Sequence, residues 1–534
     1  MLERNLTIPS WENLSLKEQI AQMIVVRASG YLFDHQIRYP AWEASNDRLQ
    51  RWLLELNLGG VILLGGSSIE LQKRSLTLQS WAKIPLLIAA DIEEGIGQRF
   101  PGGTWFPPPM ALSAIYDSNP KLALDYATRM GEITAQEAIA VGINWVLAPV
   151  VDVNNNPHNP VINVRAFGES TEVVSALSTA FIKGAKSYPV LTTAKHFPGH
   201  GDTATDSHLE LPSLPHNDAR LARLELPPFK AAIAAGVDSV MTAHLSIPAW
   251  DNKPATLSTE IITGKLRQQL DFSGLVVTDA LIMGGITKYA PPEEAAILAV
   301  EAGNDILLMP DDPEVAIASI YDAVRSGRIS QERIEQSLKR IWQAKIKTLT
   351  SVAPTPTLSS SKARSIVNAI VRDSLLTANV PLVASANNNS RNLIVVDDIL
   401  NASYLDLNAP AIAIPQKLDY QRQIVDSTTL DCILSDSRST LLQVFIRGNP
   451  FRGNAGLTNR TKQIYRQLIN KGQVEAIIIY GSPYVLDWFK SFINNKLPCV
   501  FTYGQMKQAQ AIALNTLYDL DSEVHKAKSS NFGF

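Results

Sequence analysis

Eight short apolar runs recur along the first part of the chain, with amphipathic stretches between them. The runs are continuous rather than alternating, which is typical of parallel strands buried on both faces. Stretches such as Ala127–Ala140 and Pro292–Ala302 carry apolar residues at helical spacing and suit crossover helices. The pattern predicts an α/β fold, a TIM-like (β/α)8 barrel. Its expected strands are Met23–Val26, Gly60–Leu64, Pro85–Asp91, Trp145–Asp152, Leu191–His196, Ser239–His244, Gly274–Asp279 and Asp305–Met309.

A second pattern begins after residues 351–361 (SVAPTPTLSSS), a stretch rich in Pro, Ser and Thr that has no periodicity. It follows Gln331–Thr348, a helical segment that would close the barrel. We therefore expect a catalytic barrel over residues 1–350, a linker over 351–361 and a smaller, doubly wound α/β sandwich domain over 362–534. The smaller domain has no glycine-rich phosphate loop, so no nucleotide cofactor is expected. Its expected strands are Asn392–Val396, Ala411–Ile414, Leu442–Ile446, Ala476–Tyr480 and Cys499–Thr502.

Composition and charge narrow the classes of partner. The 534 residues carry a net charge of −3, with none of the basic excess that nucleic acid binding requires. No run reaches the roughly 18 apolar residues of a membrane span. Because Met1–Ser10 also lacks an apolar leader core, a cytoplasmic location is expected. Two cysteines, Cys432 and Cys499, exclude a disulfide framework, and we expect both to be buried as small apolar side chains.

The densest group of ionisable residues follows the fifth expected strand. Residues 195–208 (KHFPGHGDTATDSH) hold three of the eight histidines, two aspartates and a lysine. Ionisable side chains rarely gather so densely for folding alone, and barrel enzymes build their active sites from loops that follow strands. The segment therefore predicts proton transfer, metal binding or recognition of a polar ligand.

Asp206 and His208 lie two residues apart within this segment. In an extended backbone they would point to the same side, so the carboxylate would orient an imidazole, the group suited to proton transfer near neutral pH. A loop held by local hydrogen bonds, with His208 solvated, explains the same residues. Asp279 ends the seventh expected strand, where it would serve as nucleophile, base, metal ligand or helix N-cap.

Further charged residues end other expected strands. Asp91 and Arg99 share one loop and would hold a polyol by paired hydrogen bonds, as would Arg165; surface ion pairs explain these residues equally well. Lys195 and His196 are neighbours, so strand alternation would send one to the barrel rim and the other towards the helices unless the strand bends. Asp152 and His244 also end expected strands.

Taken together, these motifs resemble glycoside hydrolase family 3, in particular its β-N-acetylhexosaminidase branch, which acts on cell-wall sugars. The resemblance spans nearly the whole chain, and the second domain looks like the family's α/β sandwich. It implies that Asp279 is the nucleophile and that His208, paired with Asp206, is the general acid/base. The motifs that carry it are residues 195–203 (KHFPGHGDT), Asp206-Ser207-His208, Asp91 with Gln98-Arg99, residues 165–168 (RAFG), residues 254–258 (PATLS), and residues 278–281 (TDAL) with Met283.

The same resemblance implies a retaining exo-β-N-acetylglucosaminidase that removes terminal N-acetylglucosamine from peptidoglycan fragments such as muropeptides, with no metal and no cofactor. The groups implied to hold the terminal sugar are Asp91, Arg99, Arg165, Lys195 and His196. Two positions depart from the family pattern. Many members have a second acid directly after the nucleophile, where Ala280 stands, and a Gly-Gly-Arg run in place of Glu94-Gly95-Ile96. Neither departure removes an implied catalytic group.

Other functions stay open, as does the oligomeric state. A histidine acid/base reduces negative charge near the anomeric centre, so phosphate can replace water and make the protein a phosphorylase; a β-glucosidase of the same family is a further alternative. A metal-dependent barrel hydrolase would use His196, His200, Asp202 and His208 as ligands. A further alternative is a protein that has lost catalysis and uses the same cleft only to bind sugar.

Overall fold

The computed structural model describes residues 8–349, 357–382, 390–426, 428–433, 436–448, 456–493 and 496–520. Its first sheet has eight parallel strands, β1 (Ile24–Ser29), β2 (Gly60–Leu64), β3 (Leu87–Ala90), β4 (Trp145–Val146), β5 (Leu191–Phe197), β6 (Ser239–Thr242), β9 (Leu275–Thr278) and β10 (Leu307–Leu308). Their spatial order follows the chain, and β10 pairs with β1. A parallel bridge between Val277 and Ile306 joins β9 to β10 and closes the ring. The predicted TIM-like barrel is confirmed, with one strand at each expected place.

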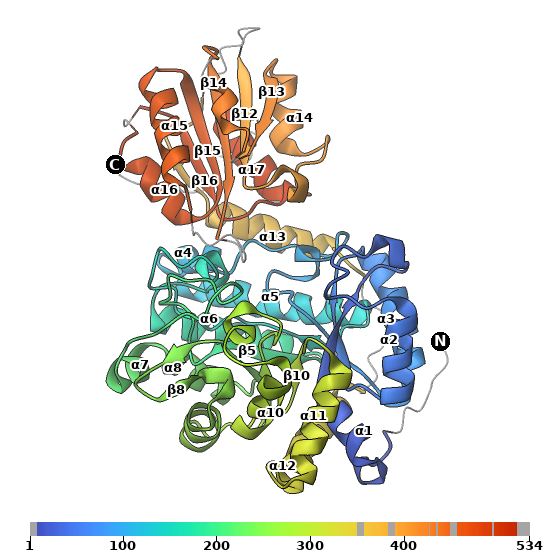
Figure 1. Ribbon diagram of the computed structural model, residues 1–534. Coiled ribbons are helices and arrows are strands. Elements are labelled where there is room, and N and C mark those ends of the chain that lie inside the picture. The colour runs from blue at the N-terminus through green and yellow to red at the C-terminus, as the bar shows by residue number, and fades with distance from the viewer. Residues whose placement is uncertain are drawn as a thin grey trace.

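Helices surround this ring (Figure 1). Several begin where the sequence supplies a cap: Asn119 and Ser330 accept first-turn amides, and prolines open others at the first helical position. The helices are α1 (Leu16–Ala21), α2 (Asn46–Arg51), α3 (Ser68–Trp81), α4 (Met110–Tyr116), α5 (Pro120–Ala140), α6 (Thr171–Ala185), α7 (Asp218–Leu224), α8 (Leu226–Ala234), η7 (Glu260–Gln269), α9 (Gly284–Thr287), α10 (Pro292–Ala302), α11 (Pro313–Arg325) and α12 (Gln331–Thr348). A two-stranded ribbon, β7 (Ser246–Ile247) with β8 (Asp251–Pro254), follows β6.

The barrel interior is a packed core. Trp145 on β4 is fully buried, and its indole Nε1 donates to Thr193 Oγ1 at 2.9 Å and to Ser239 Oγ at 3.0 Å. A buried indole N–H needs such acceptors, because an unpaired one is costly. The centre of the barrel therefore carries no open channel at this level, and the site must lie at a rim.

The second sheet has the order β11-β16-β15-β14-β12-β13, parallel except for β11. Helices cover both of its faces, which confirms the predicted doubly wound domain: α14 and α17 pack on one face, α15 and α16 on the other. The strands are β11 (Leu376–Ala378), β12 (Arg391–Val396), β13 (Gln421–Val425), β14 (Thr440–Ile446), β15 (Val474–Gly481) and β16 (Cys499–Thr502); the helices are α13 (Ser361–Asp373), α14 (Pro410–Lys417), α15 (Asn459–Asn470), α16 (Pro483–Lys490) and α17 (Lys507–Tyr518).

One expected strand of this domain is wrong. Ala411–Ile414 lies within helix α14, which Pro410 opens at its first position. A short apolar run fits a buried helix as well as a strand, so the pattern was ambiguous there. The strand beside β12 is instead β13, whose first two residues are exposed at the sheet edge. Cys499 is buried as expected, whereas Cys432 is exposed, contrary to expectation.

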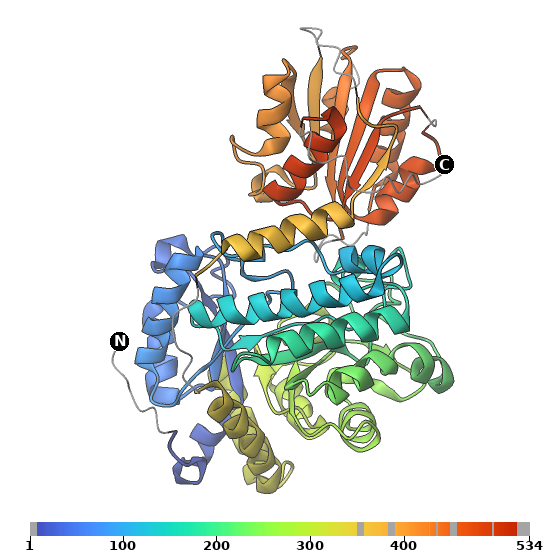
Figure 2. The same cartoon turned by 180° about the vertical axis from the view of Figure 1, so that it is seen from behind.

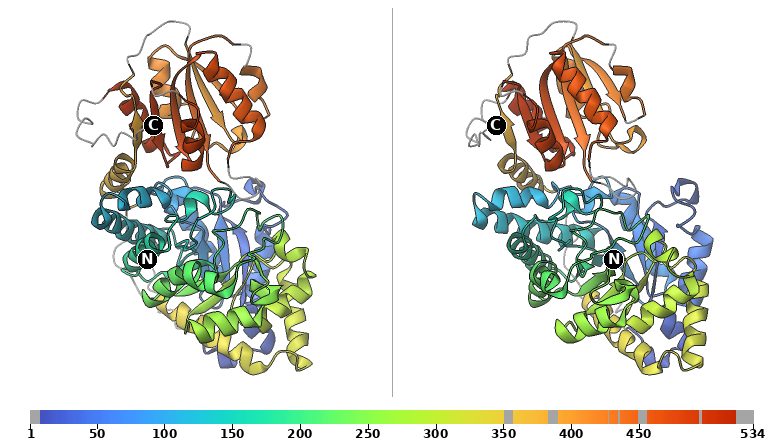
Figure 3. Two further views of the ribbon diagram at one scale, coloured as in Figure 1. Left: turned by 90° about the vertical axis from the view of Figure 1, so that its left-hand side faces the viewer. Right: turned by 60° about the vertical axis from the view of Figure 1, so that its left-hand side comes forward.

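Helix α13 lies between the barrel and the second sheet (Figures 1 and 2). The Tyr126 hydroxyl of α5 donates to Asp373 of α13 at 2.7 Å, and Glu137 of α5 accepts the Ser359 amide at 2.7 Å. Figure 3 shows the second domain seated on one side of the barrel. Residues 351–356 of the expected linker lie outside the described residues, and the domain limits stay predictions. Within the described part of the chain, no helix combines the length and apolar character needed to cross a bilayer.

Candidate active site

A cavity of about 440 Å³ lies between the barrel rim and the second domain. This volume falls in the range of small-molecule sites, roughly 300–1,000 Å³. Seven of the eight site residues expected from sequence line it: Asp91, Arg99, Arg165, Lys195, His196, His208 and Asp279. The eighth, Asp206, lies behind His208. The second domain contributes Asp397, Asp398, Tyr404, Arg447, Gly448 and Gln505 to the same lining.

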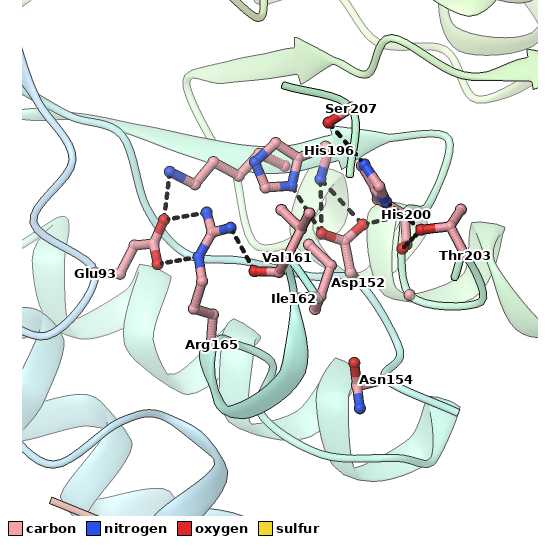
Figure 4. Close-up of polar contacts among 12 residues, drawn as sticks. Glu93, Asp152, Asn154, Val161, Ile162, Arg165, His196, His200, Thr203 and Ser207 are labelled. Atoms are coloured by element: carbon pink, nitrogen blue, oxygen red, sulfur yellow. Dashed lines mark hydrogen bonds and ion pairs between the residues drawn. The ribbon is translucent and has the colours of Figure 1, made fainter. Parts of the chain in front are cut away.

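A buried charge network forms one wall of the cavity. Lys195 Nζ contacts Asp91 Oδ1 at 2.7 Å and Glu93 Oε1 at 2.6 Å, and the lysine side chain is 1% exposed. Arg165 donates to both carboxylate oxygens of Glu93, at 2.7 and 2.8 Å, and to Val161 O (Figure 4). Burial raises the pKa of Glu93, but Arg165 and Lys195 outweigh it and hold that pKa well below its usual value. Glu93, Arg165 and Lys195 are therefore held as ions in a fixed arrangement.

Both Lys195 and His196 face the cavity. The register of β5 against β6 shifts between Ala194 and Phe197, so strict alternation is lost at this strand end. The strand therefore bends at this point, and the two neighbours share one site. Arg99 completes the group from the loop after β3, where its Nε donates to Asp91 O at 3.2 Å.

Asp152, after β4, orients two histidines. It accepts from His196 Nδ1 at 2.8 Å, from the His196 amide, and from the His200 amide at 2.7 Å (Figure 4). Because an ionised carboxylate only accepts, the His196 proton sits on Nδ1 and leaves Nε2 for the cavity. Burial raises the pKa of Asp152, but His196 and His200 together outweigh burial and hold that pKa below its ordinary value. Asp152 thus fixes the ring orientation of a histidine that lines the cavity.

His200 stabilises the loop that carries His208. Its ring nitrogens bond Thr203 Oγ1 at 2.8 Å and Ser207 Oγ at 2.9 Å, and burial lowers its pKa to about 4. Gly201, in the same loop, packs closely against the backbone of Val153. A Cβ on Gly201 would lie 1.7 Å from Val153 O. Only glycine fits there, which explains one glycine of the KHFPGHGDT motif.

Asp206 and His208 form the pair expected from their spacing, but the backbone conformation that brings them together differs from the expected one. Residues 207–209 form a turn rather than an extended segment. Asp206 Oδ1 accepts from His208 Nδ1 at 2.8 Å and from the His208 amide at 2.9 Å. The Asp206 side chain is fully buried, whereas that of His208 is 20% exposed at the cavity. His208 is therefore anchored rather than freely solvated.

Asp279 follows β9 and lines the same cavity. Burial raises its pKa, but His196, His244, His208 and the Ala280 amide together lower it to about 2. Asp279 Oδ1 accepts the Ala280 N–H at 2.8 Å. The helix-cap alternative is wrong, because α9 begins five residues later with Met283 at its N-cap position. The carboxylate is ionised at neutral pH and available to a ligand.

Backbone hydrogen bonds join the loop of His208 to the loop of Asp279. The Gly284 amide donates to His208 O at 3.1 Å, and the Gly285 amide donates to Ser207 O at 3.2 Å. A Cβ on Gly284 would lie 2.6 Å from Leu209 O, so this close approach needs glycine.

The four ligands of the metal-site alternative do not converge. Both ring nitrogens of His200 bind hydroxyl groups, and Asp202 bonds His216 at 2.8 Å and Arg220 at 3.1 Å. Across the described ranges, no group of three or more His, Cys, Asp or Glu side chains is arranged to hold a metal ion. The geometry contradicts a metal centre built on this loop.

Sequence reasoning missed several residues of the site. Asp152 and His244 were noted at strand ends, but their partners were not predicted. His244 bonds Thr256 Oγ1 at 2.8 Å and Ala280 O at 3.0 Å behind Asp279. Nothing local in the sequence marked Arg447 and the other second-domain residues, because they reach the cavity only through the packing of two domains.

Comparisons with known proteins agree with this geometry. Residues 15–344 match the family described as "Glycosyl hydrolase family 3 N terminal domain", and residues 383–519 match "Bacterial Glycosyl hydrolase family 3 C-terminal domain". A beta-hexosaminidase A of Pseudoalteromonas piscicida is 37% identical over 332 residues, which cover 56% of this chain and 55% of that protein. A beta-N-acetylglucosaminidase/beta-glucosidase of Cellulomonas fimi is 32% identical over 305 residues, 54% of this chain and 52% of that protein. The chain thus spans about half the length of these two relatives.

Solved structures show the same two-domain architecture. A glycoside hydrolase family 3 beta-N-acetylglucosaminidase from Paenibacillus sp. str. FPU-7 is 29% identical, with a TM-score of 0.79, and the match covers 95% of this chain and 97% of that one. A beta-glucoside phosphorylase is 22% identical with a TM-score of 0.80, covering 96% and 93%; at this identity the likeness concerns the fold alone.

Proposed function

Because this chain belongs to glycoside hydrolase family 3, as its motifs predicted, we propose that it is a retaining exo-β-N-acetylglucosaminidase. The observation that carries the proposal is one cavity that joins Asp279, the anchored His208 and five polar groups suited to a sugar ring. The names of similar proteins, beta-hexosaminidase and beta-N-acetylglucosaminidase, support the acetamido sugar as substrate.

In the proposed first step, the Asp279 carboxylate attacks the anomeric carbon as the glycosidic C–O bond breaks. His208 Nε2 gives its proton to the leaving oxygen, while Nδ1 stays bonded to Asp206. The product is a sugar covalently bound to Asp279. The low pKa of Asp279, about 2, suits a nucleophile that must be ionised in this step and a leaving group that must depart as a carboxylate in the next.

In the proposed second step, His208 Nε2 takes a proton from water as the water oxygen attacks the anomeric carbon. The bond to Asp279 breaks, and the sugar leaves with its original β configuration. Asp91, Arg99, Arg165, Lys195 and His196 would hold the sugar hydroxyl groups throughout. Lys195 and Arg165 are fixed by Glu93, so little freedom is lost when the sugar binds.

The experiment compares release of p-nitrophenol from the β-N-acetylglucosaminide and the β-glucoside, with the wild-type protein and with His208→Ala. We expect strong preference for the acetamido sugar and a large loss of turnover in the variant. Preference for the glucoside would retain the fold and nucleophile but overturn the substrate. Turnover of neither would overturn the proposed activity.

A phosphate arm separates hydrolysis from phosphorolysis. Turnover is measured in phosphate and in a non-phosphate buffer, with the sugar product identified by mass. Free N-acetylglucosamine in both buffers is expected; a sugar 1-phosphate that forms only with phosphate would make the protein a phosphorylase.

Cell-wall fragments are the natural substrate that we propose, on the strength of the family resemblance. Release of N-acetylglucosamine from a muropeptide should exceed release from a chitin disaccharide at equal concentration; the reverse order would contradict the proposal. The cytoplasmic location stays a prediction that cell fractionation can check.

A further inference from the structure

Arg447 of the second domain lies at the point of that domain where ligand sites usually form. It directly follows β14, the neighbour of β12 in the second sheet. From β12 the chain continues to β13 on one side, whereas β14 leads to β15 and β16 on the other side. In open α/β sheets, the crevice at such a reversal of strand order binds ligands. Here the crevice opens onto the barrel, and Arg447 lines the same cavity as Asp279.

The guanidinium of Arg447 pairs with Glu94 of the barrel. Nη2 donates to Glu94 Oε1 at 2.6 Å, and Nη1 donates to Oε2 at 3.2 Å. Trp105 Nε1 donates to the same carboxylate at 2.9 Å, and the Glu94 side chain is fully buried. Burial lowers the pKa of Arg447, but Glu94 raises it above the ordinary value. A paired, two-point contact of this kind fixes both partners in position.

Glu94 stands in the loop that presents Asp91 and Arg99 to the cavity. It adds a third carboxylate to Asp91 and Glu93 in that loop, while residue 96 is the apolar Ile96. Ile96 is fully buried and supplies no charge. The cation that pairs with Glu94 therefore comes from the second domain.

The ion pairs around the loop leave Arg447 as the cation for Glu94. Lys195 contacts Asp91 and Glu93, and Arg165 contacts Glu93. Among the described residues, the ion pair of Glu94 is with Arg447. Without it, a buried carboxylate would lie unpaired directly beside Glu93, which costs more than an exposed charge and displaces the loop.

We propose that Arg447 is a substrate-positioning residue, which acts through Glu94 on the loop of Asp91 and Arg99 and so makes sugar binding depend on the second domain. The inference rests on the proposed function, because it takes the cavity to be a sugar site. It assigns a role in substrate binding to the second domain, whose sequence alone left its role open.

The test compares Arg447→Met, Arg447→Lys, Glu94→Gln and the double variant Glu94→Gln/Arg447→Met. The readouts are kcat and KM for the p-nitrophenyl glycoside that the wild type cleaves best. Arg447→Met should raise KM about 10- to 100-fold, with kcat within about threefold. Arg447→Lys should fall between it and the wild type. The double variant should recover most of the loss, because a neutral amide at 94 needs no cation.

Tyr484→Phe is the matched control for a contact between the domains. Tyr484 receives a hydrogen bond from Asn154 Nδ2 at 2.6 Å and donates to Glu169 Oε1 at 2.5 Å, and it does not line the cavity. The control should lower Tm and leave KM unchanged. If Arg447→Met lowers Tm in the same way but leaves KM within twofold, Arg447 only ties the domains and the proposal is overturned. Should Arg447→Met not fold, an unchanged KM in Arg447→Lys together with the double variant would overturn it equally.

Calorimetric binding of N-acetylglucosamine and of glucose separates this inference from the proposed function. A wild type that cleaves neither glycoside but binds a sugar, with binding weakened in Arg447→Met, supports the positioning role while the proposed activity fails. A wild type that binds neither sugar overturns both.

Discussion

The carboxylate of Asp206 holds His208 at two points, through the backbone amide at 2.9 Å and through ring Nδ1 at 2.8 Å. The same oxygen thereby fixes both the turn and the orientation of the ring. Since the carboxylate is buried, the negative charge acts on the imidazole at close range with little screening by solvent. The pair therefore suits the proposed acid/base role, because Nδ1 is bound to Asp206 and Nε2 is left for the cavity.

Replacing this carboxylate should slow catalysis with little effect on binding. We expect Asp206→Asn to lower kcat by about 10- to 100-fold, because an amide neither stabilises the charged ring nor enforces the proton on Nδ1. KM should stay within about twofold. Steady-state kinetics on the p-nitrophenyl substrate measure both quantities. Asp202→Asn is the control, since Asp202 lies in the same loop but bonds His216 and Arg220. Equal losses in both variants would contradict the role of Asp206.

Loss of the proposed nucleophile should abolish turnover but not binding. We expect Asp279→Ala to lower kcat by at least about a thousandfold, because no other carboxylate is assigned to attack the anomeric carbon. Azide should restore part of the turnover by filling the vacated space, and the product should be a glycosyl azide of α configuration. Calorimetry with N-acetylglucosamine checks that the site persists. Turnover equal to the wild type would refute the assignment, and so would azide rescue that gives only the free sugar.

Gly448 of the second domain makes another close approach to the barrel. A Cβ at this position would lie 2.6 Å from Asn163 Cβ, in the turn that carries Arg165. We expect Gly448→Ala to lower the free energy of unfolding by about 1–3 kcal/mol and to raise KM, because the added methyl displaces that turn. Chemical denaturation and kinetics measure the two effects. Gly456→Ala, where the nearest atom is Val485 Cγ2 at 3.9 Å, should change neither. A Gly448→Ala protein with wild-type KM would show that the turn tolerates the methyl.

Lys345 should make stability rise with pH. It is buried at the end of α12, where Nζ donates to Gln22 Oε1 at 2.7 Å and to Pro85 O at 2.6 Å. Burial lowers its pKa from 10.5 to about 7. Between these values the unfolded chain binds more protons than the native one, so the contribution of Lys345 to stability should increase by about 3 kcal/mol from pH 7 to pH 10.

Lys345→Met removes this titration, and Lys339→Met on the same helix serves as its control. Urea unfolding at several pH values should show that the difference in stability between wild type and Lys345→Met grows in favour of the wild type as pH rises. The Lys339→Met protein, altered at an exposed position, should follow the wild type. A constant difference for Lys345→Met would mean that Lys345 keeps its ordinary pKa in the fold.

The barrel was predictable because its strands are short apolar runs, several of which are followed by a polar residue. The second domain was harder at its edge. Strand β13 starts with the exposed residues Gln421 and Arg422, which carry no apolar signal, while the apolar run Ala411–Ile414 belongs to a buried helix. A pattern of apolar residues shows which segments are buried. A short apolar run does not by itself show whether the buried segment is a strand or a helix.

The residues of the candidate site also fall into those that the sequence indicated and those that it did not. Residues 195–208 lie close in sequence, so their spacing already indicated a site. The pair of Arg447 and Glu94 joins residues 353 positions apart, and no local pattern records it. The role of Asp152 was also hidden, since a carboxylate at a strand end becomes informative only when the two histidines that it orients are known.

The amides of Gly284 and Gly285 donate to the carbonyl groups of His208 and Ser207. Main chain, rather than side-chain rotamers, therefore sets the gap between the proposed nucleophile and the proposed acid/base. In the proposed reaction, a sugar ring that enters this gap would meet two reacting groups whose separation was fixed when the loops folded. The same bonds imply that the two loops shift together or not at all, so the enzyme would keep its reacting distance even when the surrounding cavity adapts to a different leaving group.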